Sequence, residues 1–178
     1  FAKQFYFFAF EDENKVVNHY LYVSNDGSDE TGDGTENNPF ATIFRAVDVV
    51  TENADNSYYN QYTIKVADGY YDELCYYDKD NEKYNAFPLI NYVTYEGNTE
   101  HPENCVIYYD GQQRFGGNNA TPTDKCAVFH GLNSNRHGGG LSNRSIVKGF
   151  TLEGHYLRYC LHVDSAGYGI GEDYEFSD

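Results

Sequence analysis

Short β-rich runs recur along this chain of 178 residues, and most of them end in Asp-Gly, Glu-Gly or His-Gly. The runs occupy residues 62–69, 91–97, 105–111, 126–131, 145–154 and 159–164, and a last strand-like run, Asp-Tyr-Glu-Phe, lies near the end. A strand and a turn that repeat at intervals of roughly 20–30 residues are typical of a solenoid. A β-sandwich also contains many short strands, so it is the alternative.

One segment has the periodicity of an α-helix. Its apolar residues follow the spacing i, i+3, i+4, i+7 and form a single stripe: Ile43, Ala46, Val47 and Val50. Asn38 is placed to cap this helix, and Pro39 is placed to occupy its first position. The pattern therefore predicts a helix that begins near residue 39 and buries one face.

The residues that lead into this helix follow a distinctive order. Tyr22 to Thr35 read YVSNDGSDETGDGT, and Pro39 to Ile43 read PFATI. This order resembles the entry segment of right-handed parallel β-helix proteins of the pectate-lyase-like superfamily. The resemblance implies an all-β fold, a right-handed parallel β-helix solenoid whose N-terminal end is capped by the helix.

On this interpretation the chain has three parts: an aromatic N-terminal segment (1–18), a strand, loop and capping helix (19–61), and β-helix rungs (62–178). Two inserts, 76–87 and 112–125, interrupt the rungs and are expected to project from one face. No closing helix follows the last run, so we expect a β-helix that is truncated at the C-terminus.

The charge of the chain disfavours some partners. It has 12 Lys and Arg against 28 Asp and Glu, which gives a net charge of −16. Such a field repels nucleic acid and anionic membranes, and the apolar start FAKQFYFFAF is too short to insert across a membrane. Acidic polysaccharides would also be repelled, unless a bound cation bridges the two acids. The 19 Tyr residues offer flat faces with a polar rim that suit sugar rings, although strand-rich proteins also favour Tyr.

The chain has four cysteines: Cys75, Cys105, Cys126 and Cys160. They contain no CxxC pair, so a structural zinc site is not expected. Three of them open or join β-rich runs and would fall in a stack inside a coil, as small buried thiols. A disulfide between neighbouring rungs is the alternative.

The richest cluster of reactive side chains lies near the C-terminus. It combines two carboxylates, two imidazoles and a guanidinium: Glu153, His155, Arg158, His162 and Asp164. Neighbouring strands are about 5 Å apart, so side chains at the ends of successive runs are expected to form a column of carboxylates, namely Glu96, Asp110, Glu153 and Asp164. A glycoside hydrolase would use two of them as acid and base.

A calcium-dependent lyase would use the same column differently. Glu96 and Asp110 would hold calcium against the acid group of the substrate. A basic side chain would take the proton, and the candidates are Arg158, Arg136 and Lys148. The alternative is that the acids are solvated ends of turns, because Asp-Gly and Glu-Gly are ordinary turn pairs.

Three tyrosines, Tyr95, Tyr109 and Tyr156, are expected to stack on sugar rings. The resemblance implies a polysaccharide or surface glycan as the partner, outside the cell or on the surface of a virion. A secreted polysaccharide lyase or hydrolase is one function of this kind. The other is a non-enzymatic structural or receptor-binding module of a phage tail spike or similar appendage. Formation of a homotrimer would favour this second function, as would the aromatic start of the chain. No catalytic signature of the superfamily matches the sequence.

Overall fold

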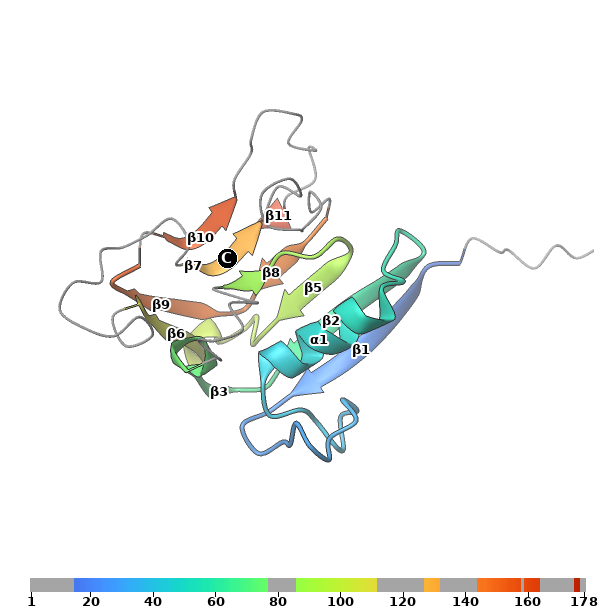
Figure 1. The fold of residues 1–178 in the computed structure, drawn as a ribbon, viewed down its shortest axis with the longest axis horizontal. Coiled ribbons are helices and arrows are strands. Elements are labelled where there is room, and N and C mark those ends of the chain that lie inside the picture. The colour runs from blue at the N-terminus through green and yellow to red at the C-terminus, as the bar shows by residue number, and fades with distance from the viewer. Residues whose placement is uncertain are drawn as a thin grey trace, which may run out of the picture.

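Parallel β-strands are the main regular secondary structure of this protein, a computed structural model that describes residues 15–76, 86–111, 127–131, 144–157, 159–163 and 175–176. In this part of the chain the strands form three sheets, here called first, second and third (Figure 1). The first sheet contains β1 (Val17–Val23), β2 (Asn60–Val66), β5 (Val93–Glu96), β8 (Ile146–Lys148) and β11 (Glu175–Phe176); the second contains β3 (Gly69–Tyr71), β6 (Cys105–Asp110) and β9 (Thr151–His155); the third contains β4 (Phe87–Pro88), β7 (Ala127–Gly131) and β10 (Tyr159–Val163).

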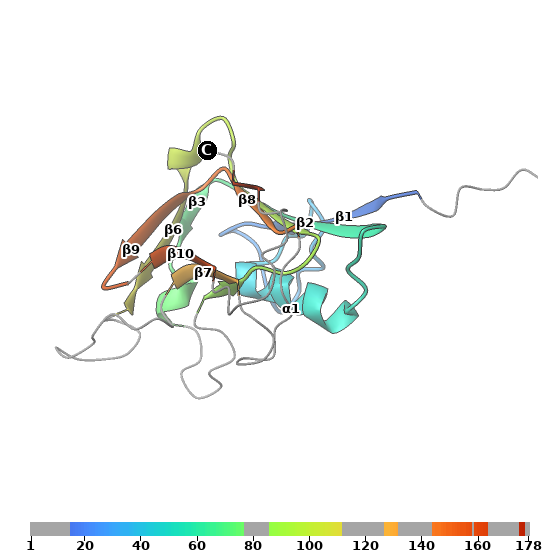
Figure 2. The ribbon, with the colours of Figure 1, turned by 90° about the horizontal axis from the view of Figure 1, so that it is seen from above.

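The chain visits the three sheets in a fixed cyclic order. From β2 it passes to β3 and β4, returns to the first sheet at β5, and repeats this circuit through β8 to β11 (Figures 1 and 2). Each strand pairs in parallel with the strand one circuit later; Thr63 lies beside Thr94, and Thr94 beside Ile146. The circuits are thus longer and less even than the period of roughly 20–30 residues expected from the sequence.

Close packing at the corner between the first and second sheets favours glycine at two positions. Gly149, between β8 and β9, has a φ of 74°, in the left-handed region that glycine adopts most readily. It lies against Gly97, where an added Cβ would come within 2.3 Å of the Gly149 carbonyl oxygen. The two glycines therefore allow successive circuits to turn in contact.

The helix α1 (Ile43–Asn53) begins later than the sequence pattern predicted. Its N-cap is Thr42, whose side chain accepts a hydrogen bond from the Arg45 amide at 3.1 Å. Residues 39 and 40 remain extended, because the Phe40 amide donates to the Tyr22 carbonyl oxygen at 2.9 Å. Asn38 and Pro39 therefore belong to the loop, and the prediction that they start the helix is wrong.

The start of α1 is also held by two carboxylates from elsewhere in the chain. Asp29 accepts hydrogen bonds from the Ala41 and Thr42 amides. Glu73, in the short 3-10 helix η1 (Glu73–Cys75), accepts from the Ile43 amide at 2.8 Å and from the Phe44 amide at 3.1 Å. The helix dipole favours an anionic partner such as Asp29, and the hydrogen bonds to Asp29 and Glu73 attach the helix to the rest of the fold.

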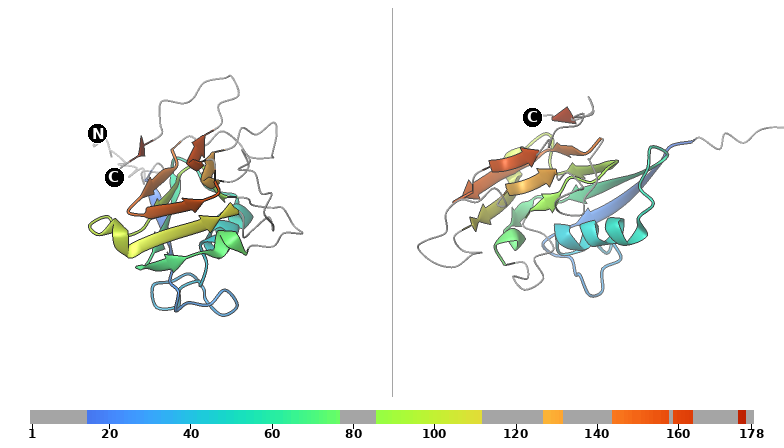
Figure 3. Two further views of the ribbon diagram at one scale, coloured as in Figure 1. Left: turned by 90° about the vertical axis from the view of Figure 1, so that its left-hand side faces the viewer. Right: turned by 45° about the horizontal axis from the view of Figure 1, so that its top comes forward.

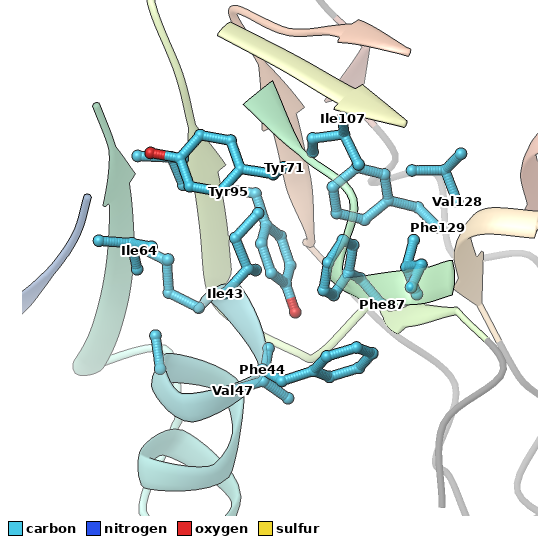
Figure 4. Close-up of a cluster of buried hydrophobic side chains, with 14 of the residues drawn as sticks. Ile43, Phe44, Val47, Ile64, Tyr71, Phe87, Tyr95, Ile107, Val128 and Phe129 are labelled. Atoms are coloured by element: carbon cyan, nitrogen blue, oxygen red, sulfur yellow. The ribbon is translucent and has the colours of Figure 1, made fainter. Parts of the chain in front are cut away.

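The core lies between the sheets and under α1. The helix contributes its predicted apolar stripe together with Phe44, and it lies beside β1 and β2 (Figure 1). Phe87, Phe129 and Tyr95 point toward one another in the interior (Figure 4), with ring centroids 5.5 Å apart for Phe87–Phe129 and 5.1 Å for Tyr95–Phe129. Phe87 was expected in a projecting insert, but it belongs to β4 and is fully buried.

The described cysteines do not form the single stack that the sequence suggested. Cys105 is on β6 and Cys160 on β10, in different sheets, and Cys75 is in η1. All three are thiols, and Cys126 lies outside the described residues.

A second short 3-10 helix, η2 (Pro102–Asn104), leads into β6. Among the described residues, no helix has the length and apolar character needed to cross a membrane.

Candidate functional site

The outer face of the second sheet carries the candidate site. Along β6, Cys105, Ile107 and Tyr109 are buried, whereas the residues between them face outward. This alternation follows from the pleat of a strand, which directs successive side chains to opposite faces. Tyr108 and Asp110 therefore lie on the outer face, which Figure 3 (left) shows with β3, β6 and β9 side by side.

Three rings form a continuous strip across the strands of this face. Tyr70 on β3 stacks on Tyr108 on β6, with centroids 5.6 Å apart and planes at 27°. Tyr108 in turn contacts His155 on β9, with centroids 5.3 Å apart and planes at 50°. We call Tyr70, Tyr108 and His155 the aromatic ladder. Tyr70 is 50% exposed and His155 is also exposed, whereas Tyr108 between them is half-buried, so the strip is accessible mainly at its two outer rings.

Carboxylates flank the aromatic ladder. The parallel register places Glu153 beside Tyr108 and Asp110 beside His155. The Tyr108 hydroxyl donates to Asp110 Oδ2 at 3.5 Å. Burial raises the pKa of Tyr108, and the negative charge of Asp110 raises it further. The pKa of Tyr70 is raised in the same way, first by burial and then by charged neighbours that include Glu153.

This arrangement is suited to binding a sugar chain. Tyrosine faces stack on the apolar faces of sugar rings, and carboxylates accept hydrogen bonds from hydroxyl groups. Successive rings of the ladder are spaced like neighbouring strands, so a ligand with a regular repeat would contact several of them at once.

Two of the three tyrosines expected to bind sugar lie elsewhere. Tyr95 and Tyr109 are fully buried in the core, so neither ring is available to a ligand, and these two predictions are wrong (Figure 4 for Tyr95). The third, Tyr156, directly follows β9 and is 56% exposed. The sequence analysis missed Tyr70 and Tyr108. For Tyr108 a signal existed, because Asp110 two residues later marks the outward positions of β6.

The proposed reactive cluster is divided between sheets. Glu153 and His155 lie two residues apart on β9 and are both exposed. His162 belongs to the third sheet, where it stacks on His130, with centroids 4.7 Å apart, and on Tyr159 at 4.6 Å. Arg158 and Asp164, like the alternative base Arg136, lie outside the residues whose side chains the structure describes.

The expected calcium ligands do not share a site. Glu96 is on the first sheet and Asp110 on the second. Glu96 Oε1 lies 2.5 Å from Lys65 Nζ, and its Oε2 lies 3.0 Å from Lys148 Nζ. Burial alone would raise the pKa of Glu96, but the hydrogen bonds and charges of the two lysines lower it overall.

Glu96 therefore fits a calcium ion poorly, because two ammonium groups already neutralise it. The single column of carboxylates expected from the sequence is likewise wrong for Glu96, which is on a different sheet from Asp110 and Glu153. Within the described residues, no three or more His, Cys, Asp or Glu side chains are grouped so as to hold a metal ion.

Comparisons with known proteins give no assignment. No protein-family model matches the sequence, no curated protein matches it, and no solved structure matches the fold.

Proposed function

We infer that the chain forms a right-handed parallel β-helix, with α1 covering its N-terminal end. The cyclic path through three parallel sheets supports this inference, because each circuit stacks on the previous one in register. Right-handedness follows from the strong general preference of parallel crossover connections. The stacked interior of Phe87, Phe129 and Tyr95 is consistent with a coil whose circuits bury a continuous core.

We propose that this module binds polysaccharide along the aromatic ladder, outside the cell or on a virion surface. The exposed strip of Tyr70, Tyr108 and His155 carries the proposal. Tyr70 and His155 are exposed and Tyr108 is half-buried, and the three rings lie at diagonal positions of neighbouring strands, where they provide a rigid surface for an extended glycan. A homotrimer of an appendage would present three such surfaces.

The test is affinity electrophoresis through gels that contain neutral, acidic or cationic polysaccharides, with calcium and with chelator. We expect wild-type protein to be retarded by at least one glycan. Tyr70→Ala with Tyr108→Ala should weaken that binding about tenfold or more, which corresponds to roughly 1.4 kcal/mol.

The matched control is Tyr58→Ala with Tyr59→Ala. Both of these side chains are 46% exposed, and they lie just before β2, in the first sheet. This double variant should bind like wild type. Equal losses in the two double variants, or no retardation of folded wild-type protein by any glycan, would refute the proposal.

Cleavage of the bound glycan is a second candidate function. Asp110 and Glu153 sit at diagonal positions of neighbouring strands, beside Tyr108, where side-chain attachment points are about 7–8 Å apart. Side chains from such positions can place their carboxyl groups about 6.5–9.5 Å apart, the separation at which an acid and a base admit a water molecule between them. Asp110→Asn and Glu153→Gln should each abolish release of reducing ends, and an unchanged rate in either variant would exclude this role.

A further inference from the structure

We propose that residues 1–10 pair as a strand with the free edge of β1 in the same chain. The free edge is the side of Asn18 and Tyr20 that faces away from β2. Among the described strands, β1 is the end strand of the first sheet and pairs with β2 on one side only (Figure 1). The inference is independent of the proposed polysaccharide binding, because it concerns the first sheet and not the aromatic ladder of the second.

The hydrogen bonds of β1 show which of its residues face this edge. In a parallel pair, the N–H and C=O of one residue point toward the neighbouring strand, and those of the next residue point away from it. The Val17 amide donates to the Tyr59 carbonyl oxygen at 2.8 Å, on the β2 side. On the other side, the Tyr22 amide donates to the Gly34 carbonyl oxygen at 2.8 Å, and the Tyr22 carbonyl oxygen accepts from the Phe40 amide at 2.9 Å. The even-numbered residues of β1 therefore direct their backbone groups away from β2.

The loop before α1 covers only the C-terminal half of this edge. Asn18 and Tyr20 have the same parity as Tyr22, but no described residue pairs with their N–H and C=O groups on this side. The same half of the strand exposes apolar side chains, with 43% of Val16, 47% of Val17 and 50% of Tyr20 exposed. β1 contains no Pro, Lys, Arg, Asp or Glu, the residues that commonly protect an edge strand from pairing. It therefore presents an unprotected template for a further strand.

The N-terminal segment has the composition and the position to fill this template. Residues 1–14, which lie outside the described part of the chain, lead into β1. Residues 1–10, FAKQFYFFAF, include six aromatic residues and no Gly or Pro, which favours a strand. Residues 11–14, EDEN, are polar and supply a connection of the length common in β-hairpins. At about 3.3 Å per residue, residues 1–10 are long enough to run back along the whole free edge.

The charge of the molecule favours the chain's own segment over a second copy as the partner. Two copies, each with a net charge of −16, repel one another. A segment tethered by a short connection has an effective concentration on the order of millimolar, whatever the protein concentration. Pairing within the chain would also satisfy the free edge and so prevent copies from associating through it.

Amide hydrogen exchange of the full chain, followed for each residue by NMR, tests the proposal. The Asn18 and Tyr20 amides face the free edge, whereas the Ala67 amide donates to the Val23 carbonyl oxygen at 2.9 Å and reports that the sheet is folded. In dilute wild-type protein, the Asn18 and Tyr20 amides should exchange at least about tenfold more slowly than in an unstructured peptide. Nuclear Overhauser contacts should join these two residues to residues 1–10.

Two adjacent proline substitutions test whether residues 1–10 provide the pairing. Phe5→Pro with Tyr6→Pro removes neighbouring backbone donors, so the ladder loses one of them in either register. This double variant should speed exchange at Asn18 and Tyr20 about tenfold or more and change exchange at Ala67 by less than about twofold. The matched control, Phe5→Leu with Tyr6→Leu, keeps both N–H groups and an apolar segment, so it should exchange like wild type.

Three results would overturn the proposal. The first is unprotected Asn18 and Tyr20 amides in wild-type protein whose Ala67 amide is protected. The second is equal exchange in the proline variant and wild type, or the absence of contacts from Asn18 and Tyr20 to residues 1–10; the contacts in wild type decide even where the proline variant is less stable. The third is protection that increases with protein concentration, together with a dimer in sedimentation equilibrium, which would assign the free edge to a second copy.

Discussion

Glu73 shows how one side chain can join distant parts of this fold. Its two carboxyl oxygens accept hydrogen bonds from the amides of Ile43 and Phe44, at the start of α1. Burial raises the pKa of Glu73 to about 8, and the charges of Asp29 and Asp72 act in the same direction. Folded protein therefore holds a proton on this group that unfolded protein releases near its ordinary pKa of 4.5.

The protonation of Glu73 predicts a dependence of stability on pH. Because its folded pKa is above the unfolded value, its contribution is fully present below pH 4.5 and is lost as the pH rises through about 8. Between pH 4.5 and about pH 8 the free energy of unfolding should therefore fall by up to about 1.4 kcal/mol per pH unit. Glu73→Gln cannot titrate, so urea unfolding of this variant should lack that slope. Parallel pH profiles for the variant and wild type would contradict the assignment.

Tyr108 and Tyr109 show that the role of a tyrosine in a strand depends on which face of the sheet its side chain occupies. They are adjacent and chemically identical, yet Tyr109 is fully buried while Tyr108 contacts Tyr70 and His155 on the outer face. Moving the register by one residue would exchange their roles. A binding role assigned to a strand tyrosine therefore requires knowledge of which face meets the core.

Among the elements, α1 has hydrogen-bond partners for the amides at its N-terminus, whereas the backbone of its C-cap is strained. Thr42, Asp29 and Glu73 all accept hydrogen bonds from amides at its N-terminus. At the other end the C-cap is Ala54, with a φ of 52°, and its amide donates to the Val50 carbonyl oxygen. The left-handed conformation at this position favours glycine over alanine.

We therefore predict that Ala54→Gly stabilises the protein. The substitution relieves the unfavourable φ and should raise the free energy of unfolding by about 0.5–1 kcal/mol, measured by urea unfolding. Glu52→Gly, two residues earlier and inside the helix, is the control and should lower it by about 1 kcal/mol. A loss of stability in both variants would show that the C-cap is not strained.

At the scale of the whole molecule, the negative charge opposes the compact state. The net charge of −16 produces repulsion across the whole molecule. The attraction within the row Lys65–Glu96–Lys148 is local to three side chains. Self-repulsion of this size destabilises a folded chain at low ionic strength, and salt screens it.

The melting temperature should consequently rise by several degrees between about 10 mM and about 200 mM NaCl at neutral pH, where the screening length falls below about 10 Å. Differential scanning calorimetry measures this shift. Near the isoelectric point the same addition of salt should have little effect, because the repulsion is then small. A melting temperature that falls with salt at neutral pH would mean that attractive pairs dominate.

Local sequence patterns were sufficient to predict the features that depend on neighbouring residues. The apolar stripe of α1 and the positions of most β-rich runs could be read from local periodicity, because the helical spacing and the strand pleat are set within a few residues. Two short strands, β3 and β4, were missed or placed in a loop, since runs of two or three residues carry too little pattern.

The side chains that meet across the circuits could not be predicted from such local patterns. Glu73 is thirty residues from Ile43, its hydrogen-bond partner, and the aromatic ladder joins Tyr70, Tyr108 and His155 from three separate strands. Such contacts depend on the length of each circuit and on the register between strands, which no local pattern specifies. The chemistry of the candidate site therefore depends on how the circuits stack, whereas local patterns locate the helix and most of the strands that form those circuits.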